Sequence, residues 1–433
     1  MQNIELLSTK QTGRFKAPAR LKRMLTSFSS SLPTGTAFEL ELGDERMRIG
    51  EGQVEFRVSI HNRRALSALS TMDERRIGEA YLDGDISIEG NLVAALNLRK
   101  SLTDHHWLFR LWSTYGQKLF FGQVSSDKEW IRQHYDNESD FYLLFLDKEH
   151  RCYSHGYFDA PDEPLHRAIQ RKLDTAIEAC AIQPGWRVLD IGAGWGAFTE
   201  HAGKQGVRVT SLTISAESER YVNELIARKQ LPCEVVCEHL LEYRAKEPYD
   251  AIVNLGVTEH LPDYPATLAQ YQRLLKPGGR VFLDACASRV KYSFSSFVLS
   301  HVWPGNTTPL DLAGYMTALA DTPFELIYAR NDRNNYLLTT KHWAENLDRH
   351  RDEIVAKWGE RWYRRFRLYL WGCVHSFASD DVTAYRLLLE LPSDSRSRKH
   401  NDASRFSRSR SSLAARMWKA TRSAWRFPRG QRG

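Results

Sequence analysis

The fold of this chain is decided by the stretch Val188-Leu189-Asp190-Ile191-Gly192-Ala193-Gly194-Trp195-Gly196-Ala197-Phe198. An apolar run leads into a Gly-x-Gly-x-Gly segment, and a helical pattern follows it. Glycine lets the backbone turn sharply and approach a ligand without an intervening Cβ. We interpret the stretch as the first strand and first helix of a nucleotide-binding α/β domain. A glycine run alone is weak evidence, so the residues after it decide the ligand.

The residues that follow alternate between strand and helix patterns. Strands are predicted at 186–191, 208–213, 249–255 and 279–285, and helices at 197–205, 215–229 and 264–275. The segment Leu275-Lys276-Pro277-Gly278-Gly279 indicates a helix stop and a turn into the last of these strands. This alternation predicts a doubly wound, mostly parallel sheet with helices on both faces.

The length of 433 residues is enough for more than one core, and three regions are predicted. They are residues 1–125, 126–393 and 394–433. The first combines strand patterns at 37–42 and 54–60 with a helical pattern at 71–82, which indicates a smaller α+β domain. The second is the α/β domain. Between them, aromatic residues are dense at 105–121, either as a packed linker helix or as a surface for a lipid or partner.

The positive charge of the chain lies in its last forty residues. Residues 394–433 hold twelve Lys or Arg and two Asp or Glu, whereas the remainder has a net charge of −3. Leu413, Met417, Ala420 and Ala424 recur at helical spacing between basic residues, which favours an amphipathic helix on an anionic membrane. A disordered solubilising tail is the alternative. Nucleic acid is not expected as a partner, because no base-reading element accompanies the charge.

Several classes of protein are disfavoured by composition. No apolar run approaches the roughly 20 residues of a membrane span, and no signal peptide is recognised. The six cysteines lack a disulfide spacing, and Cys233 and Cys237 have no second pair, so no metal site is predicted. We expect a cytoplasmic protein, associated peripherally with the inner face of the membrane.

The ligand expected at the glycine turn is a nucleoside without pyrophosphate. A dinucleotide site usually has Gly-x-Gly-x-x-Gly and an acidic residue that ends the second strand. Here the second strand ends in Thr213-Ile214-Ser215. S-adenosylmethionine, a nucleoside with an amino-acid arm, suits these residues. The fourth strand ends near Glu259-His260, where open α/β sheets bind ligands, and this pair could serve acid–base chemistry or cap the next helix.

An ordered set of motifs resembles the cyclopropane-fatty-acyl-phospholipid synthase family of S-adenosylmethionine-dependent methyltransferases, which includes mycolic acid methyltransferases. The motifs are Gly78 to Asp85, His134-Tyr135-Asp136 with Phe141-Tyr142, Tyr153 to Phe158, Leu189 to Gly196, Leu212 to Ser215, Gly256 to His260, Trp303-Pro304-Gly305, and Tyr336 with Thr340 and Trp343. They cover roughly residues 35 to 390. The resemblance implies a class I methyltransferase-like sheet of seven strands.

The resemblance also implies the site residues. The expected cofactor contacts are Tyr153, Ser154, Asp190, Gly192, Gly194, Trp195, Thr213, Ser215, Ser218, Leu241 and Glu242. Glu259 and Tyr336 match residues that hold a bicarbonate ion in the family. At three further positions of that anion site the family has Cys, His and Ile, and this chain has His155, Asp284 and Cys286.

These departures lead to two hypotheses. An anion beside Asp284 and Glu259 would meet like-charge repulsion, so we expect that bicarbonate is not bound as in typical members. Asp284 could then take the proton, with His155 as its partner. Alternatively, His155, Glu259 and Asp284 could handle an amine or hydroxyl nucleophile of a non-lipid acceptor.

The predicted function is methyl transfer to the cis double bond of an unsaturated phospholipid acyl chain, with a cyclopropane, methyl or methylene product. The N-terminal domain is expected to present lipid or to form a homodimer. The alternatives are a methyltransferase of a small polar molecule and a catalytically silent relative that binds cofactor or lipid.

Overall fold

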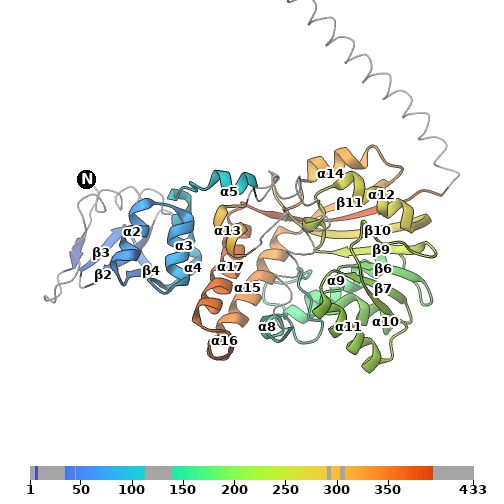
Figure 1. Cartoon of the computed structure of the whole chain (residues 1–433), viewed down its shortest axis with the longest axis horizontal. Coiled ribbons are helices and arrows are strands. Elements are labelled where there is room, and N and C mark those ends of the chain that lie inside the picture. The colour runs from blue at the N-terminus through green and yellow to red at the C-terminus, as the bar shows by residue number, and fades with distance from the viewer. Residues whose placement is uncertain are drawn as a thin grey trace, which may run out of the picture.

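Two β-sheets organise the chain in the computed structural model (Figure 1). The structure describes residues 5–7, 35–43, 45–112, 139–289, 294–302 and 308–393. We call the described part up to residue 112, which holds the five-stranded sheet, the N-terminal unit. The part from residue 139 onward, which holds the seven-stranded sheet, is the larger unit. The predicted boundary near residue 125 and the tail 394–433 lie outside the described residues.

The N-terminal unit is a sheet of order β1-β3-β2-β4-β5 covered by short helices. Its elements are β1 (Glu5–Leu7), β2 (Thr36–Leu42), β3 (Glu45–Gly50), β4 (Gln53–Ile60), α2 (Arg63–Thr71), α3 (Glu74–Leu82), β5 (Ile86–Gly90), α4 (Leu92–Leu96), a 3₁₀ helix (Asn97–Ser101) and α5 (Trp107–Leu111). The helix expected at 71–82 begins later than predicted. The Asp73 side chain accepts a hydrogen bond from the Arg76 N–H and caps α3, while Met72 ends α2 in the left-handed region.

The larger unit has the strand order β11-β12-β10-β9-β6-β7-β8. The strands are β6 (Arg187–Ile191), β7 (Arg208–Thr213), β8 (Glu234–Cys237), β9 (Tyr249–Leu255), β10 (Leu275–Ala287), β11 (Glu325–Asn331) and β12 (Thr383–Glu390). Six of the seven strands run in the same direction. The reversed strand is β12, which pairs antiparallel with β10 and β11. The prediction of a doubly wound, mostly parallel seven-stranded sheet is confirmed.

The helices of the larger unit cover both faces of this sheet (Figure 1). They are α8 (Ser139–Phe145), α9 (Leu165–Ala179), α10 (Ala197–Gly203), α11 (Ala216–Lys229), α12 (Tyr264–Leu274), α13 (Ser296–His301), α14 (Leu312–Leu319), α15 (Arg333–Arg349), α16 (Arg351–Trp358) and α17 (Glu360–Ala378). Val188 and Phe282 pack in one apolar cluster with α8, α9, α15 and α17. Leu189 and Leu283 pack in another with α12 and α14. Neighbouring strand residues thus point to opposite faces, and both faces are buried, as in parallel sheets.

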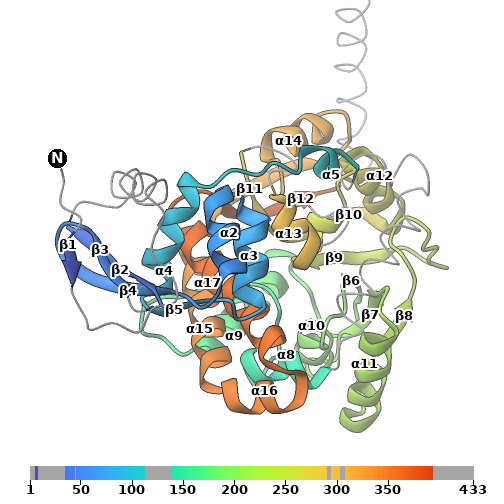
Figure 2. The ribbon, with the colours of Figure 1, turned by 60° about the vertical axis from the view of Figure 1, so that its left-hand side comes forward.

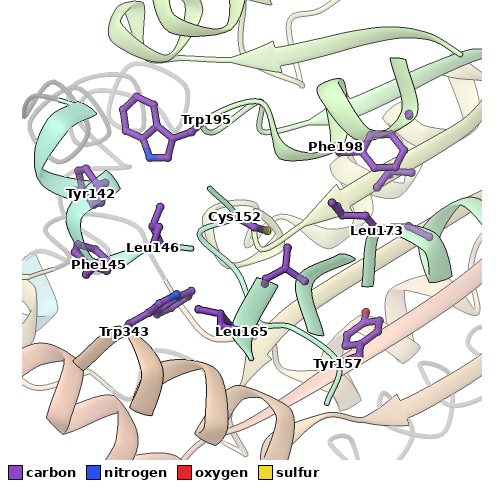
Figure 3. Close-up of a cluster of buried hydrophobic side chains, with 14 of the residues drawn as sticks. Tyr142, Phe145, Leu146, Cys152, Tyr157, Leu165, Leu173, Trp195, Phe198 and Trp343 are labelled. Carbon is purple, nitrogen blue, oxygen red and sulfur yellow. The ribbon is translucent and has the colours of Figure 1, made fainter. Parts of the chain in front are cut away.

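One cluster brings distant segments together beneath the glycine turn. Figure 3 shows Tyr142 and Phe145 of α8, Leu165 of α9, Trp195 of the turn and Trp343 of α15 around a common apolar region. The ring centroids of Tyr142 and Trp195 are 5.8 Å apart. The Trp195 ring also meets Tyr221 of α11, at a centroid distance of 5.6 Å, so the turn packs against α8 and α11.

One sequence expectation for the sheet was wrong in part. The segment 275–279 was predicted as a helix stop and a turn into the next strand; α12 does end there, with Leu275 as its C-cap, but β10 already begins at Leu275, which pairs with Tyr249 of β9. The register then shifts between Leu275 and Arg280. Gly278 has φ +82°, so the Pro-Gly-Gly residues form an irregularity within the strand rather than a separate turn.

The two units are joined by α13, which follows β10 but packs on the N-terminal unit. Phe297 of α13 belongs to the same cluster as Phe38 and Phe56 of the N-terminal sheet. A Cβ on Gly78 of α3 would lie 2.5 Å from the Phe297 ring, so glycine permits this close approach. Figure 2 shows α13 beside α3. The units therefore share an interior.

Candidate active site

The glycine turn needs its three glycines because each has a positive φ. The angles are +91° at Gly192, +50° at Gly194 and +76° at Gly196. A Cβ on Gly192 would lie 2.3 Å from the Val257 side chain. The Gly192 and Ala193 N–H groups both donate to the Leu212 carbonyl, which fastens the turn to β7. The turn is therefore fixed in shape before any ligand arrives.

A cavity of about 140 Å³, here called the small cavity, lies over this turn at the carboxyl ends of β6, β7 and β9. This is where open α/β sheets bind their ligands. Nine of the eleven predicted cofactor contacts line it: Tyr153, Ser154, Asp190, Gly192, Gly194, Trp195, Thr213, Ser215 and Ser218. The structure thus brings together residues that lie up to 65 positions apart in the sequence.

Leu241 and Glu242 are the exceptions. The lining after β8 consists of Glu238, His239 and Leu240 instead. The Glu242 N–H donates to the His239 carbonyl, so the chain turns away from the cavity before residue 241. Leu241 and Glu242 thus do not line the small cavity, and their contact with the cofactor stays a prediction. The family motif gave no local signal for where this turn begins.

Asp190 is the last but one residue of β6 and is buried. Its carboxylate accepts a hydrogen bond from the Ser211 hydroxyl at 2.9 Å. Burial raises the pKa of Asp190 to about 7, although the hydroxyls of Ser211 and Thr199 oppose that shift. Ser218 donates to the Gly194 carbonyl at 2.7 Å, and Ser215 caps α11. These side chains hold the turn as well as lining the cavity.

A second and larger cavity of about 590 Å³, here called the large cavity, lies between the two units. It shares Tyr153, Gly256 and His260 with the small cavity. Its walls are mainly apolar, with Phe297 and Val298 from α13 and several side chains from the N-terminal unit. A ligand in the small cavity would therefore meet a second ligand held in an apolar space.

Glu259 lines the large cavity close to this junction. It lies in a 3₁₀ turn, Thr258–His260, directly after β9. Its Oε1 accepts a hydrogen bond from the Cys286 N–H at 2.6 Å, while Oε2 is buried with no hydrogen-bonding partner in the described part of the chain. Burial, together with the nearby Asp284 carboxylate, raises the pKa of Glu259 to about 7. Such a carboxyl group can gain or lose a proton near neutral pH.

Tyr336 of α15 lines the same cavity. Its ring stacks between His155 and Phe377, and each centroid distance is 4.6 Å. Burial raises the pKa of Tyr336 well above its ordinary value, with the Glu259 carboxylate acting in the same direction. The phenol therefore stays protonated and can donate a hydrogen bond into the cavity.

Asp284 of β10 forms an ion pair that sequence analysis missed. Its Oδ2 lies 3.0 Å from the Nζ of Lys172 on α9, and both side chains are fully buried. The same ammonium donates to the Ser154 hydroxyl, which lines the small cavity. Burial opposes the charge of Lys172, yet the attraction of Asp284 and other nearby groups raises the pKa of this lysine overall. Lys172 is therefore charged.

A signal for Lys172 was present in the sequence. The buried face of α9 includes Leu165, Ala168, Ile169, Leu173 and Ala176. Helical spacing places residue 172 on that face. A lysine on an apolar face needs a buried carboxylate partner, but the sequence does not say which one.

His155 does not pair with Asp284, contrary to expectation. Its Nε2 lies 3.6 Å from Oδ2 of Asp332, which in turn binds Arg386 through two contacts of 2.6 and 2.7 Å. Burial raises the pKa of Asp332, but His155 and Arg386 hold it well below its usual range. Neither His155 nor Asp284 lines the two cavities in the described residues. Both lie behind the site, each with its own charged partner.

The comparisons with known proteins agree with this geometry. The family model "Mycolic acid cyclopropane synthetase" matches residues 123–387, more than half of the chain. The chain belongs to this family. The predicted family resemblance is thus confirmed. Two of its quoted motifs, His134-Tyr135-Asp136 and Trp303-Pro304-Gly305, lie outside the described residues.

Three similar proteins illustrate the relationship. A sphingolipid C9-methyltransferase of Candida albicans is 26% identical over 331 residues, which are 72% of this chain and 64% of that protein. A probable fatty acid methyltransferase of Pseudomonas putida is 27% identical over 331 residues, 73% of this chain and 82% of that protein. A crystal structure of a mycolic acid cyclopropane synthase complexed with S-adenosylhomocysteine and CTAB is 26% identical, has a TM-score of 0.57, and covers 61% of this chain and 98% of its own. The chain spans less than two thirds of the first relative. S-adenosylmethionine is the cofactor, as predicted.

The buried ion pair generates a testable prediction. Lys172→Met leaves the Asp284 carboxylate buried without its cation and should lower the free energy of unfolding by about 3–5 kcal/mol. Denaturant unfolding measures this change.

Two matched variants control for the loss of the lysine itself. Lys148→Met removes an exposed lysine and should change stability by less than about 0.5 kcal/mol. The double variant Lys172→Met with Asp284→Asn should recover most of the loss, because no charge remains unpaired. A single variant as stable as the wild type would refute the assignment.

Proposed function

We propose that this protein transfers the methyl group of S-adenosylmethionine to a cis double bond in the acyl chain of a phospholipid. The observation that carries the proposal is the meeting of the small cavity with the large apolar cavity at Tyr153, Gly256 and His260. Apolar walls suit an acyl chain, because a polar acceptor would lose its hydration there without replacement. The names of the two relatives, which concern fatty acids and sphingolipids, support a lipid substrate.

The small cavity would hold the cofactor, and its residues would orient it. When bound, S-adenosylmethionine supplies an electrophilic methyl group. The backbone of Gly192 and Gly194 permits close approach, and the Ser154 hydroxyl is held in place by Lys172. Because both reactants are held in this way, they react from one fixed relative orientation rather than after a random encounter in solution.

The chemistry that follows requires a proton acceptor. The π electrons of the double bond form the new carbon–methyl bond, and the carbon–sulfur pair leaves with the sulfur, so a carbocation remains on the neighbouring carbon. Loss of a proton lets the freed electron pair close a cyclopropane ring or form a new double bond. We assign the proton to Oε2 of Glu259, which has no partner among the described residues. Its raised pKa suits a base that works near neutral pH.

Aromatic rings and the phenol of Tyr336 would support this step. Tyr153 and Trp343 also line the large cavity. Ring faces attract a cation in a dry site and would stabilise the carbocation without reacting with it. Their other task is to exclude water, which would otherwise add to the cation.

The residues at the expected anion site do not fit a bound bicarbonate ion. The family's cysteine and histidine are replaced by His155 and Asp284, and the first is directed to Asp332. Lys172 is already paired with Asp284. An added anion would face the carboxylates of Glu259 and Asp284 in a poorly hydrated space. The proposed mechanism therefore does not use bicarbonate.

The protein would work at the surface of a phospholipid membrane on its cytoplasmic side. Trp107, Leu108 and Trp112, at and beside α5, are exposed by 59%, 65% and 47%. Tryptophan at a surface favours the interface between lipid and water. The basic sequence 394–433, outside the described residues, would attract anionic headgroups. No helix in the described ranges is long and apolar enough to cross a bilayer.

Removing the proposed base tests its role. Glu259→Gln should lower kcat by about 10²–10⁴-fold, because the amide cannot accept the proton. Binding of S-adenosylmethionine, measured by titration calorimetry, should change little. Since the ionised carboxylate is the active form, kcat of the wild type should rise with pH through about 7, and the variant should lose this rise.

The matched control is Glu353→Gln, the same substitution at an exposed residue of α16 outside the cavities. It should leave both kcat and the pH profile unchanged. An active Glu259→Gln enzyme with the original pH profile would exclude Glu259 as the base.

Dependence on bicarbonate is a separate prediction. Addition of bicarbonate to enzyme prepared free of carbon dioxide should leave the rate unchanged at constant pH and ionic strength, because the site offers no place for the anion. The rate of S-adenosylhomocysteine release measures this. Strong stimulation would show that the assignment of the anion site is wrong.

Lipid mass spectrometry tests the substrate. Cells with and without the gene are fed methionine with a deuterated methyl group, and their phospholipids are compared. Unsaturated acyl chains should gain one carbon from the label, and two retained deuterium atoms would indicate a ring or methylene product. A label on polar metabolites and none on acyl chains would favour the non-lipid acceptor.

A further inference from the structure

The large cavity extends well beyond the methyl-transfer site. It reaches into the N-terminal unit, whose sheet contributes Phe38 and Leu40 of β2, Val58 and Ile60 of β4, and Ile86 and Ile88 of β5. These residues lie outside the matched range 123–387. The wall at this end is therefore a feature of the N-terminal unit rather than of the methyltransferase sheet.

The opposite wall is equally apolar. Leu69 of α2, Ile77 and Tyr81 of α3 and Leu368 of α17 face the same space. In most small domains, a sheet and its helices fill such a space with their own side chains, and voids larger than a water molecule are few. An apolar void of this size is unfavourable when empty, because its lining loses van der Waals contacts. The interior of the N-terminal unit is thus shaped to receive an apolar ligand.

Charged side chains mark a different part of the lining. Arg99, Lys100 and Asp381 contribute there, and Arg99 lies 3.0 Å from Glu74 in an ion pair. The residues at the sheet, by contrast, are almost fully buried: Phe38, Leu40, Ile60 and Ile86 are exposed by 4% or less. A polar headgroup can be hydrated only away from the sheet. The end at the sheet suits a hydrocarbon terminus, which needs no polar partner.

We propose that the N-terminal unit is an acyl-binding site that holds the methyl-terminal segment of the substrate chain. This inference rests on the proposed function, in which the double bond lies beside Glu259. The distance from the sheet to that residue would then select double bonds by their position counted from the methyl end. The N-terminal unit acts as part of the substrate site, in addition to any role at the membrane.

Photolabelling of the full-length protein tests this placement. Two phosphatidylglycerol probes carry a diazirine on an unsaturated acyl chain, one at the methyl terminus and one next to the carboxyl end. The first probe should label peptides from residues 35–102, and the second should not. Labelling by the first probe only within residues 139–393 would overturn the proposal.

A variant on β4 tests the same space by filling it. Val58→Phe extends into the cavity, whereas Val54→Phe makes the same change on the same strand at a residue that does not line it. With oleoyl and myristoleoyl lipids, Val58→Phe should lower kcat/KM for the longer methyl segment at least about tenfold more than for the shorter one. Val54→Phe should leave the ratio unchanged. Equal losses on both lipids with Val58→Phe would contradict the proposal.

The proposed function and the acyl-binding site can be refuted separately. Labelling of residues 35–102 without any release of S-adenosylhomocysteine from lipid would refute the proposed function and leave the acyl site standing. Turnover of lipid with labelling confined to the larger unit would do the reverse.

Discussion

The buried ion pair between Lys172 and Asp284 ties together the three segments that form the site. Lys172 lies on α9, Asp284 on β10, and the same ammonium donates to Ser154 in the loop that lines the small cavity. Two opposite charges in an apolar interior stabilise each other only at close range. The helix, the strand and the loop are therefore held in one relative position. The lining of the small cavity depends on this arrangement.

Polar groups near this ion pair also have partners of opposite charge. Asp332 is satisfied by Arg386, whose guanidinium carbon also lies 3.4 Å from the centre of the Tyr157 ring. His155 lies between this pair and Tyr336, on which its ring stacks. The charges behind the cavities are balanced by partners that do not reach the ligand space. Glu259 differs from them because it lines the large cavity and has no ion pair in the described residues; its Oε2, like Oδ1 of Asp284, is buried there without a hydrogen-bonding partner.

Much of the fold could be predicted because its signals are local. The strands at 208–213 and 249–255 have the predicted bounds, and Ser215 caps α11 next to the predicted helix start. The partners of His155 and Asp284 could not be predicted, because Asp332 and Lys172 come from distant segments that only the folded chain brings near. The lining by Glu238, His239 and Leu240 could not be predicted for a related reason: a tight turn after β8, set by backbone hydrogen bonds to the His239 carbonyl, decides which residues face the cavity. The large cavity has no sequence signal, since it arises where α13 and α17 meet the other unit.

The placement of Phe297 has a consequence for how the two units can be separated. This ring comes from the larger unit yet completes the apolar interior of the N-terminal sheet. A fragment that lacked residues 35–102 would expose Phe297 and Val298 to water, together with the inner wall of the large cavity. Such a surface promotes aggregation. Gene fusions and truncations that treat the N-terminal unit as a removable module would cut through one shared interior rather than along a boundary between two.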